Sequence, residues 1–512
     1  MTSAPVQHFI AGKSIPESSP SESSPGISTY THHNPATGEI VASVPMDSVA
    51  SAEQAVRAAA DAFSGWADTP VGERCQHLFR YKQLLEEHFE DLAALIVTEH
   101  GKTMAEARGD VRRGIDCIEF ACAAPTLMMG LSLPRIAVSS SFCRTEDEGG
   151  VGLDSAADRV PLGVCVGITP FNFPIMVPMW MWPLAVACGN TFILKPSEKV
   201  SRCAAREVEL AHEAGFPPGV LNMVTGGPAV VDHLITHEEV KAVSFVGSSR
   251  VAEHIYTAAS AAGKRVQCMG GAKNHMIIMP DANRDAAIDG VIGSAFGNTG
   301  QRCLAGSVAV VVDDAADWFN PQICKAAQQI KVAAGDQSGV GMGPLIDEAS
   351  RNRVHGAIAK GVEEGAELML DGRTFEKVNP EGGTGGGSGG GCFTGPTIFD
   401  RVRPDMSLAQ DEIFGPVLSI IREDTLDEAI TSINHSRYGN MAVIFTNSGY
   451  AAHRFKNQTQ AGMIGINVGV PAPMAVFPFA GWKNSFYGTL HANGDDALRF
   501  YTEYRITVTR WL

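Results

Sequence analysis

The sequence predicts an α/β protein with two lobes, each built around a parallel β-sheet. From residue 160 onward, short apolar runs alternate with helical stretches, as expected for parallel strands buried on both faces. The chain has 512 residues, which is long enough for two or three domains. Hydrophobic residues make up 45% and charged residues 19% of it, so the chain can bury large cores.

Helices are predicted before the first lobe, where apolar residues recur with helical spacing, over 49–63 and 74–99. In the first lobe, strands are predicted over 163–169, 191–195, 221–224 and 242–246, with helices over 200–214 and 250–262. The same alternation after residue 303 predicts strands over 308–313, 367–370, 418–422 and 442–446, with helices over 349–365 and 425–432.

Two low-complexity segments interrupt this pattern. Residues 16–27 are almost entirely Pro, Glu, Ser and Gly, and residues 382–391 are nearly all Gly. Neither segment can bury enough surface to offset its ordering entropy, so both are expected to be flexible insertions.

Charge and cysteine content exclude several classes of function. A net charge of −16 argues against binding to nucleic acid or anionic membranes. The longest apolar run, 175–188, contains two prolines and is shorter than the ~20 residues of a membrane span. The eleven cysteines form no CxxC pair or zinc-like spacing, so reduced cysteines and no metal site are expected. Residues 1–13 carry no signal or transit pattern, which predicts a cytoplasmic protein.

Cys303 is the cysteine whose surroundings suit a nucleophile. It lies between Gly300 and Gly306 and directly follows Arg302. Small neighbours let a substrate approach the sulfur, and nearby positive charge lowers the pKa of a thiol, whose thiolate is the reactive form. The alternative is a buried structural thiol.

Two further segments could support such chemistry. Asn172 lies between two prolines directly after a predicted strand and could donate a hydrogen bond to a developing oxyanion, or simply form a turn. Glu412 and Phe414 precede another strand and could seat a ribose and a flat heterocycle, or form a packed turn.

Two strand ends in the first lobe could bind a dinucleotide. Ser248 ends a strand and opens a helix, where free N–H groups suit a pyrophosphate, although Ser248 or Ser249 could instead cap an ordinary helix. Lys195 and Glu198 follow another strand and could reach a ribose, or lie in a surface turn. A carboxylate there would repel a 2′-phosphate, which favours NAD over NADP. The usual GxGxxG fingerprint is absent.

Taken in the order in which they occur along the chain, these five segments resemble the NAD-dependent aldehyde dehydrogenase superfamily. The resemblance extends from about residue 30 to the end of the chain. Four segments resemble its CoA-acylating methylmalonate-semialdehyde dehydrogenases more closely: 161–174, 195–198, 264–283 and 300–303. The resemblance implies two Rossmann-like parallel α/β lobes, NAD-binding and catalytic, plus a small β assembly flap. The implied boundaries are 1–138 and 158–270 for the NAD-binding domain, 271–485 for the catalytic domain, and 139–157 with 486–512 for the flap.

The resemblance also implies a role for each candidate residue. Cys303 matches the nucleophile, and Asn172 matches the oxyanion hole together with the backbone N–H of Cys303. A substrate carboxylate would be gripped by Arg113 and Arg302. The NAD contacts would be Lys195, Glu198, Ser248, Glu412 and Phe414.

One position departs from the hydrolytic members of the superfamily. They carry a glutamate in the motif E-L-G-G-K, and Met269 stands in its place here, which cannot act as a base. The semialdehyde family also lacks this glutamate, usually carrying Asn, and uses coenzyme A to take the acyl group.

The resemblance therefore implies NAD-dependent oxidation of methylmalonate or malonate semialdehyde through a Cys303 thioester. Decarboxylation and transfer to coenzyme A would give propionyl-CoA or acetyl-CoA. A hydrolytic aldehyde dehydrogenase and a catalytically silent binding protein remain alternatives. The resemblance further implies a homo-oligomer, a tetramer or a dimer, and a mitochondrial location in many eukaryotic members.

Overall fold

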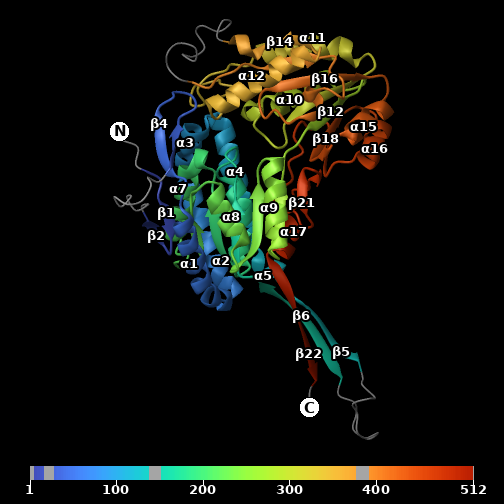
Figure 1. Ribbon diagram of the computed structural model, residues 1–512. Helices are drawn as coiled ribbons and strands as arrows, with labels where there is room; N and C mark the ends of the chain where they lie inside the picture. Colours follow the sequence, from blue (N-terminus) through green and yellow to red (C-terminus); the bar gives the residue numbers. More distant parts are fainter. Residues whose placement is uncertain (1–4, 16–27, 138–151, 376–390, 511–512) are drawn as a thin grey trace.

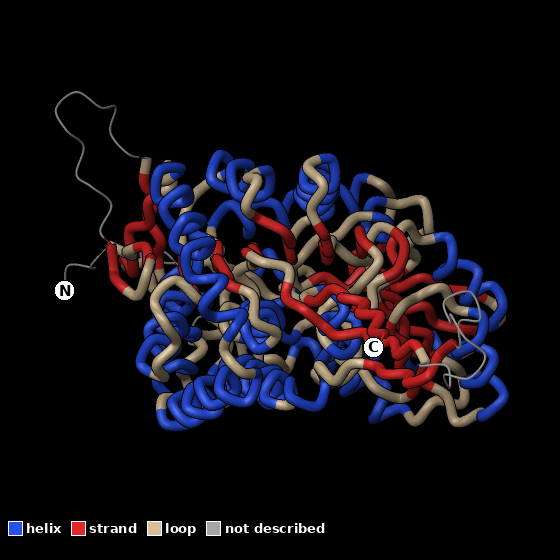
Figure 2. Tube along the Cα trace, turned by 90° about the horizontal axis from the view of Figure 1, so that it is seen from below, coloured by secondary structure: helices blue, strands red, loops and turns tan. Residues whose placement is uncertain are grey.

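Two helix-covered sheets form the body of the protein, and a three-stranded sheet projects from it (Figure 1). The computed structural model describes residues 5–15, 28–137, 152–375 and 391–510. The predicted insertion at 16–27, and all of the one at 382–391 except its last residue, lie outside the described residues. Seen from below, strands run through the body with helices on either side of them (Figure 2).

The first sheet has eight strands, and its five central strands are parallel. In spatial order these are β9 (Leu221–Met223), β8 (Thr191–Lys195), β7 (Val164–Ile168), β10 (Val240–Val246) and β11 (Arg265–Met269). Antiparallel strands extend both edges: β1 (His8–Ile10) and β2 (Lys13–Ile15) on one side, β21 (Phe486–Gly488) on the other. Every residue of β7 and β8 is buried, which explains their continuous apolar runs.

Helices cover both faces of this sheet. They are α1 (Val49–Asp68), α2 (Val71–Glu87), α3 (Phe89–His100), α4 (Met104–Cys122), α5 (Ala124–Leu127), α6 (Met176–Ala187), α7 (Ser201–Glu213), α8 (Pro228–Thr236) and α9 (Ser249–Ala261). All twelve residues of α6 are buried, so the apolar run predicted to lie inside the protein does so. Within the described part of the chain, no helix is long and apolar enough to cross a membrane.

The prediction of one helix over 74–99 was wrong. The chain forms two helices, α2 and α3, with a break at His88. Both helices pack against α4, so the apolar periodicity continues across the break and hides it. The acidic pair Glu90 and Asp91 lies in the first turn of α3, where negative charge favours a new helix N-terminus.

The second sheet has seven strands, all parallel except its edge strand β14. In spatial order they are β14 (Glu367–Leu370), β15 (Thr397–Asp400), β16 (Val417–Glu423), β13 (Gly306–Val312), β12 (Asn274–Ile278), β18 (Met441–Phe445) and β19 (Met463–Ile466). Its helices include α10 (Arg284–Ala295), α11 (Ala315–Gln328), α12 (Glu348–Glu363), α14 (Ser407–Gln410), α15 (Leu426–His435) and α16 (Gly449–Gln458). The predicted fold class is therefore confirmed.

The projecting sheet joins two distant parts of the chain. Strand β6 (Leu153–Pro161) lies between β5 (Leu131–Ala137) and the last strand, β22 (Thr502–Arg510), and both pairings are antiparallel. Helix α17 (Gly494–Phe500) leads into β22 and packs on α6. The predicted flap segment 486–512 is therefore divided between two sheets. Its strand β21 belongs to the first sheet, and its strand β22 belongs to the projecting sheet. The implied domain boundaries stay a prediction.

Candidate active site

A cavity of about 700 Å³ brings three of the predicted residues together. Cys303 and Arg302 lie on its wall from the loop before β13, and Arg113 contributes from α4. Apolar side chains fill much of the remaining wall, among them Trp180 from α6 and Phe479, whose rings lie 4.7 Å apart. A cavity with an apolar lining and a few convergent polar groups is the usual form of a small-molecule site.

The loop that carries Cys303 has an unusual backbone conformation. Asn298 and Thr299 both have left-handed dihedrals, with φ of 53° and 55°. Gly300 follows with φ of 68°, and a Cβ at this position would lie 2.1 Å from the carbonyl oxygen of Gly415. Only glycine fits there, because the Cys303 loop passes directly against Gly415. This close approach brings the Cys303 loop beside the loop that carries Glu412 and Phe414.

Two asparagines hold the backbone of Cys303 in place. Its carbonyl oxygen accepts hydrogen bonds from Asn274 Nδ2 at 2.8 Å and from Asn440 Nδ2 at 2.9 Å. Asn274 begins β12, and Asn440 precedes β18, the strand beside it in the sheet. The sequence reasoning missed both residues, because nothing in the sequence indicates that residues 274, 303 and 440 meet.

Asn172 lies beside the Cys303 loop, as predicted. It is buried, and its side-chain amide donates to the Gln301 carbonyl at 3.0 Å. Its own carbonyl accepts from Lys102 Nζ at 2.7 Å. Lys102 in turn forms an ion pair of 3.0 Å with Asp110 of α4, and both side chains are fully buried. Burial lowers the pKa of Lys102 and raises that of Asp110, while their mutual attraction opposes both shifts.

Glu106, another residue that the sequence reasoning missed, ties α4 to the same loop. Its Oε1 accepts from the backbone N–H of Asn298 and, at 3.1 Å, from Arg302 Nη2. Its Oε2 accepts from Thr103, closing a capping box on α4. An S/T-x-x-E pattern at residues 103–106 is the signal that could have located this helix start.

The arginines around the cavity differ in their partners. Arg302 already faces Glu106, and neighbouring Arg112 makes a bidentate pair with Glu86. Arg113 is exposed at the cavity and forms neither an ion pair nor a hydrogen bond with any described residue. Its guanidinium is therefore free for an anionic ligand.

Nearby positive charge acts to lower the pKa of Cys303, as predicted, but burial outweighs it. Burial raises the pKa of this partly exposed thiol to about 12, and the negative charge of Glu412 adds to the rise. Arg302 acts in the opposite direction but is outweighed. Burial also raises the pKa of Glu412 to about 7, although the Ala272 N–H donates to its Oε1 at 3.0 Å.

The predicted dinucleotide contacts gather at the carboxyl edge of the first sheet. Lys195 ends β8 opposite Ile168 of β7, and its buried ammonium makes no hydrogen bond to a described residue. Glu198 begins the short 3-10 helix that follows. Ser248 occupies the N-cap position of α9, but its side chain makes no cap hydrogen bond.

This donor set fits a dinucleotide. An unpaired ammonium and the open N-terminus of α9 suit a pyrophosphate, and the Glu198 carboxylate suits ribose hydroxyls. The ring of Phe414, in the loop before β16 of the second sheet, contacts that of Phe171, which follows β7, with centroids 5.8 Å apart. Phe414 also has a left-handed backbone, with φ of 55°, in the loop that Gly300 touches.

Met269 is the last residue of β11 and is buried, with 3% of its surface exposed. It pairs with Val246 of β10, so it lies in the strand next to the one that leads to Ser248. Two glycines follow it and lead to Ala272, which donates to Glu412. A thioether accepts no proton at neutral pH, so position 269 offers no general base.

The raised pKa of Cys303 predicts slow alkylation of the protein without ligands. At pH 8 Glu412 is mostly ionised and disfavours the thiolate, so Glu412→Gln should speed iodoacetamide labelling of Cys303 several-fold. Below about pH 6, where wild-type Glu412 is protonated, the difference should vanish. Peptide mass spectrometry measures the rates, with Glu198→Gln as the matched control. A wild-type labelling rate that levels off near pH 8 would contradict the raised pKa of Cys303.

Comparisons with known proteins agree with this geometry. The model of the aldehyde dehydrogenase family matches residues 22–507. Malonate-semialdehyde dehydrogenase 1 of Geobacillus thermodenitrificans (strain NG80-2) is 51% identical over 478 residues, covering 93% of this chain and 94% of the relative.

Two solved structures are also similar. Methylmalonate-semialdehyde dehydrogenase from Oceanimonas doudoroffii has a TM-score of 0.92 and 42% identity, covering 99% of each chain. A protein of Sinorhizobium meliloti 1021 solved in complex with NAD has a TM-score of 0.91 and 39% identity, covering 100% of this chain and 99% of that one. The chain therefore belongs to the aldehyde dehydrogenase family.

Proposed function

We propose that the chain oxidises malonate or methylmalonate semialdehyde with NAD and transfers the acyl group to coenzyme A. The observation that carries this proposal is the cavity that Cys303, Arg113 and Arg302 line together, while Met269 stands where hydrolytic relatives carry a base. A nucleophile beside free positive charge suits an aldehyde that also bears a carboxylate. Relatives whose names refer to these semialdehydes support the substrate class.

Cys303 acts as the nucleophile in this proposal. The thiol releases its proton to water, the thiolate sulfur attacks the aldehyde carbon, and the resulting oxyanion is held by the Asn172 amide and the backbone N–H of Cys303. One N–H of that amide already donates to Gln301, which orients the other one. When bound, the nicotinamide of NAD accepts the hydride that leaves the thiohemiacetal, and a thioester remains on Cys303.

The edge of the first sheet and the loop before β16 together supply the cofactor contacts. Lys195 and Glu198 hold the adenosine ribose, Ser248 contacts the pyrophosphate, and Glu412 with Phe414 holds the nicotinamide ribose. The buried ammonium of Lys195 and the uncapped start of α9 support these assignments. The NAD complex of the Sinorhizobium meliloti protein supports the choice of cofactor.

Coenzyme A completes the reaction because Met269 offers no base at the position where hydrolytic relatives activate water. The CoA thiol attacks the thioester and releases the Cys303 thiol. Loss of the substrate carboxylate as carbon dioxide makes the product acetyl-CoA from malonate semialdehyde and propionyl-CoA from methylmalonate semialdehyde. Arg113 and Arg302 hold that carboxylate until it leaves.

The projecting sheet supports assembly into a homo-oligomer, a dimer or tetramer. Its strands expose large apolar side chains: Leu131 (68%), Leu133 (57%), Ile506 (62%) and Val508 (62%). Apolar surface of this extent is typical of an interface. A second copy of the chain is the occupant that we propose.

Coenzyme A should be required for turnover. With NAD and malonate semialdehyde, the wild-type protein should form NADH continuously only when coenzyme A is present, and Cys303→Ala should form none. Absorbance at the NADH band measures the rate. Equal turnover without coenzyme A would instead support a hydrolytic enzyme, and no NADH in either case would support a binding protein.

Arg113 should determine recognition of the substrate carboxylate. Its guanidinium forms no ion pair with a described residue, so Arg113→Leu should lower kcat/KM for malonate semialdehyde by about 10- to 100-fold. The matched control is Arg112→Leu on the same helix, which only breaks the surface pair with Glu86 and should change kcat/KM less than threefold. Propanal, which lacks the carboxylate, should show no loss with either variant. Equal losses for the two aldehydes would contradict the assignment.

A further inference from the structure

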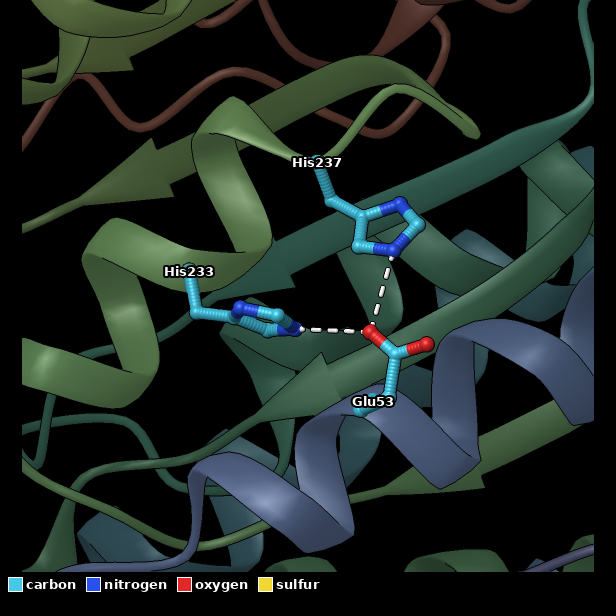
Figure 3. A group of neighbouring side chains, drawn as sticks. All are labelled: Glu53, His233 and His237. Atoms are coloured by element: carbon cyan, nitrogen blue, oxygen red, sulfur yellow. Dashed lines mark hydrogen bonds and ion pairs between the residues drawn. The ribbon is translucent and has the colours of Figure 1, made fainter.

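Three potential metal ligands meet on the first lobe, away from Cys303. Glu53 comes from α1, His233 from α8, and His237 lies directly after α8, before β10 begins (Figure 3). This position is at the amino edge of β10. Ser248 lies beyond the opposite, carboxyl edge of the same strand, so the group is separate from the dinucleotide contacts.

The side chains converge on a single carboxylate oxygen. Glu53 Oε2 lies 3.2 Å from His233 Nε2 and 3.1 Å from His237 Nε2, and all three ligand atoms lie within 4.8 Å of one another. Two ligands bonded at ~2.0–2.1 Å with tetrahedral angles around Zn²⁺ lie roughly 3.4 Å apart. The distances from Glu53 Oε2 to the two histidine nitrogens are therefore close to the distance between two ligand atoms around a tetrahedral Zn²⁺.

Hydrogen bonding among the described residues leaves one of these atoms unsatisfied. His233 Nε2 is buried and makes no hydrogen bond to a described residue, and its contact with Glu53 Oε2 at 3.2 Å is an ion pair only when the ring is protonated. A buried ring nitrogen without a hydrogen bond is costly in a folded protein. A cation between the three atoms would satisfy it.

The charge at this site also suits a cation. Arg57 donates to Glu53 Oε1 at 2.6 Å, while Oε2 lies on the side of the histidines and accepts from His237 Nε2 at 3.1 Å. The three side chains are partly exposed, at 30% for Glu53, 26% for His233 and 16% for His237, so solvent ions can reach them.

Metal binding would require one proton to move. In the structure His237 Nδ1 accepts the Glu239 N–H at 3.2 Å, so the neutral ring carries its proton on Nε2. Coordination through Nε2 transfers that proton to Nδ1 and breaks the bond from Glu239. This residue lies in an exposed turn, where water replaces the lost partner.

We propose that Glu53, His233 and His237 form a binding site for Zn²⁺ or a similar divalent transition metal, with water as the fourth ligand. Two imidazoles and one carboxylate form a donor set that such metals favour. The bound ion would connect α1 to α8, which already pack together, and would act as a structural staple.

Titration of the full-length protein with Co²⁺ tests this proposal, because Co²⁺ replaces Zn²⁺ and is coloured. We expect one Co²⁺ per chain, with visible bands of a tetrahedral ion and no near-ultraviolet thiolate band. His233→Ala and His237→Ala should each weaken binding by more than about tenfold. The matched control is His254→Ala, which removes a nearby exposed histidine paired with Asp232 and should bind as wild type does.

Cys303→Ala protein distinguishes this site from the reactive thiol. Retained binding in Cys303→Ala, together with loss in both histidine variants, supports the proposal. A thiolate band, loss of binding in Cys303→Ala, undiminished binding in the histidine variants, or no binding at all would overturn it. Circular dichroism and NADH formation establish that each histidine variant is folded.

Discussion

The loop that carries Asn172 depends on the buried ion pair between Lys102 and Asp110. Lys102 Nζ also donates to the carbonyl of Asn172, and Asp110 Oδ1 accepts from the backbone N–H of Met176, at the start of α6. Removing either partner would leave an unpaired charge in the interior, which costs roughly 3–5 kcal/mol. The pair therefore fixes the loop between β7 and α6, and with it the position of Asn172. Glu106, one turn before Asp110 on α4, fixes the Cys303 loop in the same way.

Rigid positioning of Cys303 compensates for a thiol that is not activated at rest. Hydrogen bonds from Asn274 and Asn440 hold its carbonyl, and the turn at Gly300 determines how the loop passes Gly415. Burial keeps the thiol protonated in the protein without ligands. Because Met269 offers no base, an acyl group on Cys303 would wait for an incoming thiol.

Local patterns in the sequence were sufficient for the fold class. Strand β8 begins and ends where predicted, and β7, β10, α7 and α9 differ by at most two residues at each end, because buried parallel strands leave long apolar runs. The helix break at His88 was not predicted, because α2 and α3 both bury apolar residues against α4. Cys303 and Asn172 could be singled out because their small or proline neighbours are visible in the sequence.

The supporting residues could not be identified in this way. Lys102 and Glu106 read as ordinary polar residues at a helix start, and their partners lie about 70 and 190 positions away in the chain. Asn274 and Asn440 meet Cys303 only because β12 and β18 are neighbours in the second sheet. The His-x-x-x-His spacing of residues 233–237 is visible in the sequence, but Glu53 reaches it only through the packing of α1 on α8.

The central claim is that the acyl group stays on Cys303 until a thiol removes it. Acid-quenched peptide mass spectrometry after mixing with NAD and malonate semialdehyde, without coenzyme A, tests this directly. The account predicts an acyl adduct on the Cys303 peptide in step with a single burst of NADH, and its disappearance after coenzyme A is added. An unmodified Cys303 peptide while NADH continues to form would contradict the account.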